Sequence, residues 1–455
     1  MSRNSLKYAV PAFLLGLIPA SAAVQAAGEA TEVAKPANSA DTYRELDRLM
    51  DVFERVRGEY VDKVSDKDLI EGAINGMLAS LDPHSSYMNE RSFQQMRTTT
   101  DGEYGGLGLT VTMEDGVVKV VAPTDDTPAA KAGIKANDYI THLDGELLYG
   151  GALNDAVDKM RGAPGTPIKL TVVREGMPKP MELTLKREVI QIKPVKFEAK
   201  GNVGLIRITG FSKQTGDATE QALKVLDKQI GPNLVGYIVD LRSNPGGLLD
   251  QAIQVSDAFL ERGEIVSQRG RAKGDVQRYY ARPGDLSNGK PIIVLVDEGS
   301  ASAAEIVAGA LQDHRRALVM GQRSFGKGSV QTLIPLSTDT ALRLTTARYF
   351  TPAGRSVQTL GIEPDLTVPQ LSDANYKDRT RIRESDLRRH LINDVKSGDK
   401  TLEADDKADP RFMETAEALK KRGVEDFQLD YALKTLNRLA PRVAVAQLKP
   451  ATATP

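Results

Sequence analysis

The sequence contains no cysteine, and its 455 residues include only four histidines. The absence of cysteine excludes disulfides, cysteine nucleophiles and thiolate metal sites. Four histidines leave little material for a histidine-rich metal centre, so we predict no metal and no other cofactor. Charge of one sign is not in excess either, because 60 Lys and Arg residues face 61 Asp and Glu residues. The composition therefore gives no support for a nucleic-acid partner.

The first 26 residues have the pattern of a secretory signal peptide. Arg3 and Lys7 form a short basic start, an apolar stretch covers residues 9–20, and small residues continue to Ala26. The apolar stretch is short and contains two prolines, whereas a spanning helix needs about 20 apolar residues. We expect cleavage near Ala26 and an exported, periplasmic protein. Peripheral association with the membrane is kept open as an alternative.

Changes in hydrophobic periodicity divide the rest of the chain into segments. Apolar residues recur every three or four positions from Tyr43 to Tyr60, which predicts an amphipathic helix packed on its own domain or, alternatively, a dimer contact. Short strands with two small helices follow, and then strands alternate with helices, which predicts a layered α/β core with a largely parallel sheet. The predicted segments are a flexible leader (27–40), a helical N-terminal region (41–95), a β-rich module (96–187), an α/β core (188–370), a helical C-terminal region (371–440) and a disordered tail (441–455). Within the C-terminal region we expect a solvated helix face over 376–396 and an acidic linker over 403–410.

One strand-to-helix junction of the core offers a serine nucleophile. The apolar strand over 291–297 is followed by the turn Glu298-Gly299 and by a helix that opens at Ser300. With Ser300 as the N-cap, Ser302 falls in the first turn, where unpaired backbone N–H groups could stabilise an oxyanion. The alternative is that both serines only cap and fill the helix start.

No histidine is well placed to activate Ser302. His314 lies twelve residues further along the same helix, about 18 Å away at 1.5 Å per residue. His84 and His142 belong to other predicted modules. A lysine whose pKa is lowered by desolvation is the known substitute, and Lys327 is the candidate.

Lys327 lies in the glycine-rich segment 321–329, which has two further interpretations. A phosphate-binding loop requires a hydroxyl residue after the lysine and a helix behind it, but Gly328 follows and the next residues have a strand pattern. A Ser324–Lys327 pair of the S-x-x-K type requires a helical turn, and Phe-Gly between the two disfavours one. Both interpretations are weak.

Several motifs in combination resemble the carboxy-terminal processing (tail-specific) serine peptidases. The resemblance covers residues 43–369 and rests on Ser80-Leu81-Asp82-Pro83-His84-Ser85, on Asp240-Leu241-Arg242-Ser243-Asn244-Pro245-Gly246-Gly247, on the segments around Ser302 and Lys327, and on Arg348-Tyr349-Phe350-Thr351-Pro352. It implies a ClpP/crotonase-like layered α/β core with an inserted β-rich PDZ domain at 96–187.

The resemblance also implies roles for individual residues. Ser302 would be the nucleophile, Lys327 the general base, and Gln331 the residue that orients the lysine. Gln331 can do so only across a helical or bulged segment, because a regular strand would set the two residues about 13 Å apart. The oxyanion donors would be the N–H of Ala303 and that of Gly246 or Gly247, and the loop Gly106-Leu107-Gly108-Leu109 would bind a free C-terminal carboxylate.

The predicted function is that of a serine endopeptidase. It would bind the free, apolar C-terminus of exported protein substrates through the PDZ domain and cleave them near that end by Ser/Lys acyl-enzyme chemistry. A homo-oligomer through the N-terminal helix and an activating partner protein are both compatible with this prediction. The alternative is a non-enzymatic PDZ adaptor with a degenerate protease fold, which replacement of Ser302 would distinguish.

Overall fold

The computed structural model describes residues 39–376, 381–393 and 411–439. The predicted signal peptide and leader, the acidic linker and the C-terminal tail lie outside these residues. The chain divides into two compact units, residues 1–69 and 70–455. In the described part of the chain, no helix is both long enough and apolar enough to cross a bilayer.

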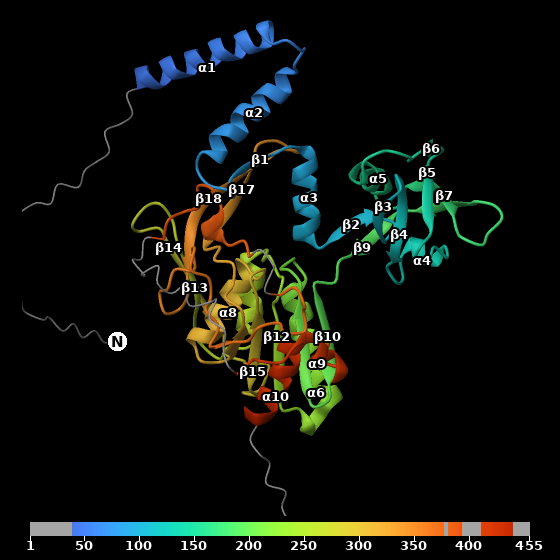
Figure 1. The fold of residues 1–455 in the computed structure, drawn as a ribbon. Helices are drawn as coiled ribbons and strands as arrows, with labels where there is room; N and C mark the ends of the chain where they lie inside the picture. Colours follow the sequence, from blue (N-terminus) through green and yellow to red (C-terminus); the bar gives the residue numbers. More distant parts are fainter. Residues whose placement is uncertain (1–38, 377–380, 394–410, 440–455) are drawn as a thin grey trace, which may run out of the picture. The chain divides into compact units, whose positions relative to one another are not determined.

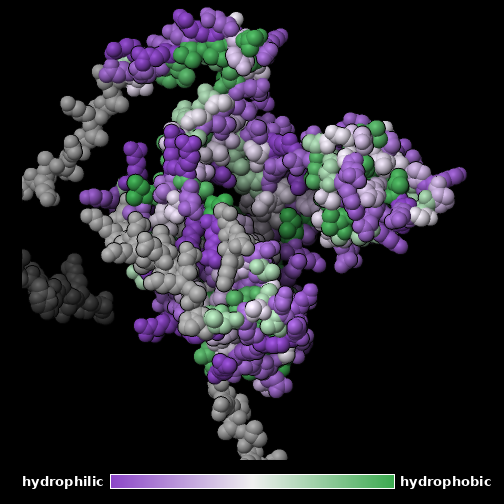
Figure 2. Space-filling model, viewed as in Figure 1, coloured by the Kyte–Doolittle hydropathy of each residue, from purple (hydrophilic) through white to green (hydrophobic). Residues whose placement is uncertain are grey.

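The first unit contains the predicted amphipathic helix as α1 (Ser39–Glu59), and α2 (Asp66–Ala79) begins in it. Ion pairs three residues apart support α1, among them Arg48 with Glu45. Hydrophobic side chains gather along α1 (Figure 2). Tyr43 and Met50 expose more than half of their surface, so the predicted stripe is not covered within this unit.

The β-rich module is a sheet in the order β3-β4-β5-β7-β8, with β6 paired to β5 (Figure 1). Its elements are β3 (Leu109–Glu114), β4 (Val117–Pro123), α4 (Pro128–Lys131), β5 (Tyr139–Leu143), β6 (Glu146–Leu147), α5 (Leu153–Met160), β7 (Pro167–Val173) and β8 (Met181–Lys186). Alternating residues of these strands form a separate hydrophobic core. A two-stranded ribbon of β2 (Glu103–Gly106) and β9 (Glu188–Gln191) joins the module to the rest of the chain. The boundary predicted at residue 95 falls inside α3 (Glu90–Asp101).

The α/β core is a six-stranded sheet in the order β10-β11-β12-β15-β16-β19. Only β10 is antiparallel, as expected for a largely parallel sheet. The strands are β10 (Val195–Lys200), β11 (Val203–Ile208), β12 (Gly236–Asp240), β15 (Ile292–Val296), β16 (Leu318–Gly321) and β19 (Leu366–Thr367). One face packs on α6 (Thr215–Ile230), which leads into η1 (Gly231–Asn233), and on α7 (Leu249–Asp257) and α8 (Ala303–Asp313).

The opposite face of the core sheet is covered by the C-terminal helices α9 (Ala416–Lys421) and α10 (Phe427–Leu439). Along β15, Ile292 and Val294 face the first set of helices, whereas Ile293 faces the second. This alternation of two buried faces explains why β12 and β15 have continuous apolar sequences. The predicted layered α/β fold is confirmed, while the ClpP/crotonase-like label stays a prediction.

A second sheet was missed by the sequence interpretation. It has the order β1-β18-β13-β14, with β17 also paired to β18. Its strands are β1 (Ser86–Met88), β13 (Gly263–Arg269), β14 (Val276–Ala281), β17 (Ser329–Pro335) and β18 (Ala341–Phe350). The sequence indicated β17 as a strand but not its partners. Most residues of β14 are at least partly exposed, so that strand shows no clean alternation in sequence.

The described residues of segment 376–396, which are 376 and 381–393, contain the short 3-10 helix η2 (Glu384–Asp386) and no α-helix. Glu384 is fully buried, and its backbone N–H donates to the carbonyl of Phe325. The other residues of 381–393 are at least partly exposed, as predicted, but Glu384 packs on the loop that carries Lys327.

Candidate active site

Three loops meet at the carboxyl edge of the parallel sheet. They follow β12, β15 and β16, and they carry Gly246, Ser302 and Lys327, respectively. Ligand sites of open parallel sheets lie at this edge, because neighbouring parallel strands all end there. The topology therefore brings together three motifs that are far apart in sequence.

Ser302, not Ser300, is the N-cap of α8, which corrects the sequence prediction. The Ser300 hydroxyl is fully buried and donates to the carbonyl of Leu241, 2.8 Å away, so it ties the turn to β12 rather than capping a helix. Ser302 has φ 54° and ψ −114°, a positive φ that a non-glycine residue rarely adopts. Strain of this kind costs about 1–3 kcal/mol and persists only where the surroundings impose it.

Glu305, one turn into α8, was missed by the sequence interpretation. Its carboxylate is fully buried and accepts hydrogen bonds from the N–H of Ser302 (2.7 Å), the N–H of Gly326 (2.7 Å), the N–H of Lys327 (3.0 Å) and the hydroxyl of Ser324 (2.6 Å). Burial raises its pKa to about 7, while these hydrogen bonds oppose the shift. The signal available in the sequence was the spacing Ser302-x-x-Glu305, the pattern of a capping box at a helix start.

Lys327 is partly buried, and the charge state of its side chain depends on several neighbours. Burial lowers the pKa of Lys327 below its ordinary value of 10.5, and the positive charge of Arg343 lowers it further. Three carboxylates oppose this shift: Glu384, Glu305 and Asp82. The net shift favours the neutral amine, which is the form able to accept a proton.

The two competing interpretations of segment 321–329 do not fit the structure. Lys327 is followed by β17 and not by a helix, so the loop has no phosphate-binding helix N-terminus. Ser324 is 1% exposed, and its hydroxyl is already bonded to Glu305 and to the N–H of Ile362. Ser324 is therefore a structural residue and not a nucleophile.

Gln331 lies on β17 at a β-bulge. The register with β18 shifts between Val330 and Gln331, so no regular strand runs from Lys327 to Gln331. The side-chain amide of Gln331 donates to the hydroxyls of Ser329 (3.0 Å) and Thr345 (3.2 Å). The backbone condition stated for the orienting role is met, and the role itself stays a prediction.

Ala303 and Gly247 offer backbone N–H groups that make no hydrogen bond within the described residues. The N–H of Gly246, in contrast, donates to the side-chain oxygen of the buried Asn244 at 2.9 Å. A Cβ built on Gly246 would lie 2.8 Å from the Cβ of Ser302 and 2.9 Å from the nitrogen of Ala303. Of the two candidate glycines, Gly247 therefore has the available N–H donor. Gly246 lacks a side chain and so allows its loop to approach Ser302 and Ala303 closely.

His84 does not lie in a separate module, as the sequence interpretation had assigned it. Its Nε2 lies 2.8 Å and 3.0 Å from the two carboxylate oxygens of Glu384, and its carbonyl accepts from Arg343 Nε. Asp82, two residues earlier, accepts from the hydroxyl of Thr345, which also accepts from Gln331. The Asp-Pro-His motif thus hydrogen-bonds to Thr345 and Arg343 of β18, and its histidine is paired with the carboxylate of Glu384.

The loop Gly106–Leu109 has the features of an anion-binding turn. Gly108 has φ 76°, and a Cβ there would lie 2.4 Å from Thr127, so only glycine fits. The N–H groups of Leu107 and Gly108 make no backbone hydrogen bond within the described residues. The Leu107 side chain is 3% exposed and belongs to the core of the module, so only its backbone is available to a ligand.

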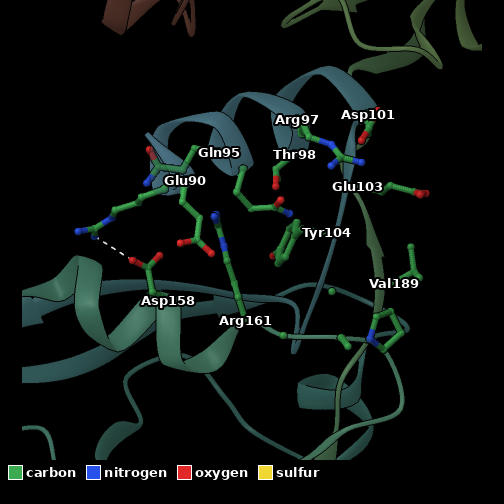
Figure 3. A pocket seen from close by; sticks show the side chains of 16 residues that line it. Glu90, Gln95, Arg97, Thr98, Asp101, Glu103, Tyr104, Asp158, Arg161 and Val189 are labelled. Atoms are coloured by element: carbon green, nitrogen blue, oxygen red, sulfur yellow. Dashed lines mark ion pairs between the residues drawn. The ribbon is translucent and has the colours of Figure 1, made fainter. Parts of the chain in front are cut away.

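A separate cavity of about 720 Å³ lies between α3 and the β-rich module (Figure 3). Its walls carry both charges, and Arg91 pairs with Asp158 across it at 2.9 Å. Neither Ser302 nor Lys327 lines it. Among the described residues there is also no group of three His, Cys, Asp or Glu side chains suited to a metal.

Comparison with known proteins places these features in a family. The chain matches Peptidase family S41 over residues 202–368, a PDZ domain over 105–185 and the Activating protease CtpB N-terminal domain over 16–92. It is 54% identical over 356 residues to a carboxy-terminal-processing protease of Bartonella bacilliformis, covering 78% of this chain and 82% of that protein. It is 36% identical to the carboxy-terminal processing protease CtpB of Bacillus subtilis, covering 73% and 70%. A solved photosystem II D1 C-terminal processing protease is 31% identical, with a TM-score of 0.41 and coverage of 70% and 92%.

Proposed function

Because the chain belongs to the carboxy-terminal processing proteases of peptidase family S41 and carries a PDZ domain, we propose that it cleaves proteins near their free C-terminus with Ser302 as nucleophile. The observation that carries this proposal is the junction at Ser302. A strained serine precedes the available N–H of Ala303 and lies against Gly246, whose neighbour Gly247 also has an available N–H. The carboxylate of Glu305 accepts hydrogen bonds from the N–H of Ser302 and from that of Lys327.

The reaction follows from these groups. The neutral amine of Lys327 takes the proton of the Ser302 hydroxyl while the oxygen attacks the scissile carbonyl carbon. The N–H groups of Ala303 and Gly247 stabilise the negative oxygen of the tetrahedral intermediate. The C–N bond then breaks, and the leaving amine receives the proton from the lysine ammonium. Water hydrolyses the resulting ester by the same steps, with Lys327 again accepting the proton.

Substrate selection is assigned to the PDZ domain. A terminal carboxylate would accept charge-assisted hydrogen bonds from the N–H groups of Leu107 and Gly108. The rest of the tail would add as a strand along β3, with the apolar residues Leu153 and Val157 of α5 facing it. Such binding tolerates many sequences, which suits an enzyme that recognises an end rather than one motif.

The place of action is assigned from the N-terminal sequence. The basic start and short apolar stretch support export and cleavage near Ala26, with the mature protein in the periplasm. Residues 16–92 match the N-terminal domain of a protease of this family, and the exposed apolar residues of α1 support a contact of this region with a partner protein or a second copy. N-terminal sequencing of the protein recovered from a periplasmic fraction tests the first point, and a full-length N-terminus would contradict it.

The central test uses an unfolded protein with and without an added apolar C-terminal tail. The wild-type protein should degrade the tailed form faster, and Ser302→Ala should abolish both cleavage and labelling by a fluorophosphonate. If Ser302→Ala cleaves the tailed protein as fast as the wild type, the adaptor alternative is favoured. The cleavage would then come from a contaminating peptidase. The surface variant Lys224→Ala is a suitable control, since Lys224 lies on the exposed face of α6.

A further inference from the structure

Glu305 is surrounded by groups that can only donate hydrogen bonds. Three of its partners are backbone N–H groups, those of Ser302, Gly326 and Lys327. The fourth is the hydroxyl of Ser324, whose oxygen already accepts from the N–H of Ile362 at 2.6 Å. The hydroxyl of Ser324 donates to Glu305. Backbone N–H groups face both oxygens of Glu305, so a glutamine amide would set its NH₂ against at least one of them. These hydrogen bonds favour the carboxylate form and oppose the burial that raises the pKa of Glu305 to about 7.

One oxygen of this carboxylate joins the two residues that perform the chemistry. Oε2 lies 2.7 Å from the N–H nitrogen of Ser302 and 3.0 Å from that of Lys327. Tyr349, fully enclosed on β18, acts on the carbonyls of the same two residues. Its hydroxyl lies 3.2 Å from the carbonyl oxygen of Ser302 and is also hydrogen-bonded to the carbonyl oxygen of Lys327.

We propose that Glu305 and Tyr349 form a clamp that fixes the nucleophile loop against the lysine loop, and that both are positioning residues for proton transfer. The inference rests on the proposed Ser302/Lys327 chemistry. Between them the two side chains contact the N–H and the carbonyl of both catalytic residues. Because these contacts use backbone groups, neither side chain touches the substrate. The clamp also explains how α8 holds Ser302 at a strained φ.

Charge distinguishes the two halves of the clamp. The titratable groups that face Glu305 are Lys327 and Tyr349, and Lys327 in turn faces Arg343, Glu384 and Asp82. The negative charge of Glu305 raises the pKa of Lys327, whereas Tyr349 carries no charge at working pH because burial raises its pKa well above 10.0. Loss of Glu305 should therefore change both the geometry and the lysine's titration. Loss of the Tyr349 hydroxyl, which also lies 3.5 Å from Glu305 Oε2, should change the geometry without removing a charge.

The test measures kcat and KM for a small activated ester as a function of pH, which separates the clamp from PDZ binding. Glu305→Gln should lower the plateau of kcat by roughly 100-fold, the cost expected for misplacing reacting groups by about 1 Å, with KM nearly unchanged. In this variant the rise of kcat with pH, called here the acid limb, should move to lower pH. Tyr349→Phe should lower the plateau as well but leave the acid limb in place.

Asp285→Asn is the matched control. Asp285 is a partly buried carboxylate that likewise accepts from N–H groups and a hydroxyl, and also from Arg316, but it serves a turn that bears no catalytic residue. Its replacement should lower thermal stability and leave the plateau and limb unchanged. Folded Glu305→Gln with a wild-type plateau, or with an unmoved acid limb, would overturn the clamp. If Glu305→Gln does not fold, wild-type kcat in Tyr349→Phe would overturn it. Ester hydrolysis that survives Ser302→Ala would instead refute the proposed function.

Discussion

Replacement of Gly246 by alanine should disturb the nucleophile more than the fold. The new Cβ would lie 2.8 Å from both the carbonyl oxygen of Ala301 and the Cβ of Ser302, and 2.9 Å from the nitrogen of Ala303. Ordinary contacts begin at 3.4 Å, so these atoms must move by about half an ångström. They are backbone or Cβ atoms, and no flexible side chain can absorb the displacement.

The expected magnitude has two parts. Gly246 has φ 98°, a region where a side chain costs about 1–2 kcal/mol, and stability should fall by that amount or somewhat more. A displacement of half an ångström at the nucleophile should lower kcat by about tenfold or more, because a misplacement of about 1 Å can cost 100-fold. The loss should fall on kcat rather than on KM for a small ester.

A second glycine separates strain from displacement. Gly201, in the turn between β10 and β11, has φ 65°, and a Cβ there meets nothing within 4 Å. Gly201→Ala should therefore lower the melting temperature without changing kcat. The assay pairs thermal unfolding with ester hydrolysis for both variants. A Gly246→Ala protein with reduced stability but wild-type kcat would refute the placement of Gly246 against the reacting serine.

Five further predictions concern the residues around Lys327 and the PDZ loop. Lys327→Arg should be as inactive on the ester as Lys327→Ala, because a guanidinium stays protonated, and a substantially active Arg variant would exclude the lysine as base. Because burial lowers the pKa of Lys327, ester hydrolysis should rise with pH through a limb centred below 10.5. Thermal stability should fall as the pH drops from 10.5 to the lower pKa of the folded state, since the unfolded lysine binds its proton more tightly. A rise of ester hydrolysis centred at or above pH 10.5 would contradict the lowered pKa of Lys327. Gln331→Ala should lower kcat by about tenfold with little change in KM, whereas wild-type kcat would leave Gln331 a packing residue. Amidation of a tailed peptide should weaken its binding, followed by fluorescence anisotropy, by a few kcal/mol at most, and an unchanged Kd would mean that Leu107 and Gly108 do not bind the carboxylate.

Disabling the PDZ loop requires more care than its sequence suggests. By its position in the loop, Leu107→Asp would place a negative charge in the proposed carboxylate site. The side chain is 3% exposed in the module's core, so the variant would bury an unpaired charge and unfold the domain. The peptide amidation above avoids this problem because it changes the ligand and leaves the protein intact.

The sequence alone determined the elements whose patterns are local. The β-rich module contains short strands, such as β5 and β8, as the sequence predicted, because their pattern is set by one buried face. The layered α/β core was likewise predictable, since continuous apolar strands alternate with amphipathic helices. The serine, the lysine and the carboxylate loop were identified by motif and by resemblance.

Only the tertiary structure decided how these parts meet. Ser302 became the N-cap because the Ser300 hydroxyl is used by β12, which no local pattern reveals. The Asn244 side chain occupies the N–H of Gly246 and leaves that of Gly247 available. Glu384 belongs to a segment that looked like a charged surface, yet it is buried against His84. The first and third results depend on contacts between residues distant in sequence, and the Asn244 side chain is itself held by the distant carbonyl of Ile208. Propensity and periodicity carry no information about such contacts.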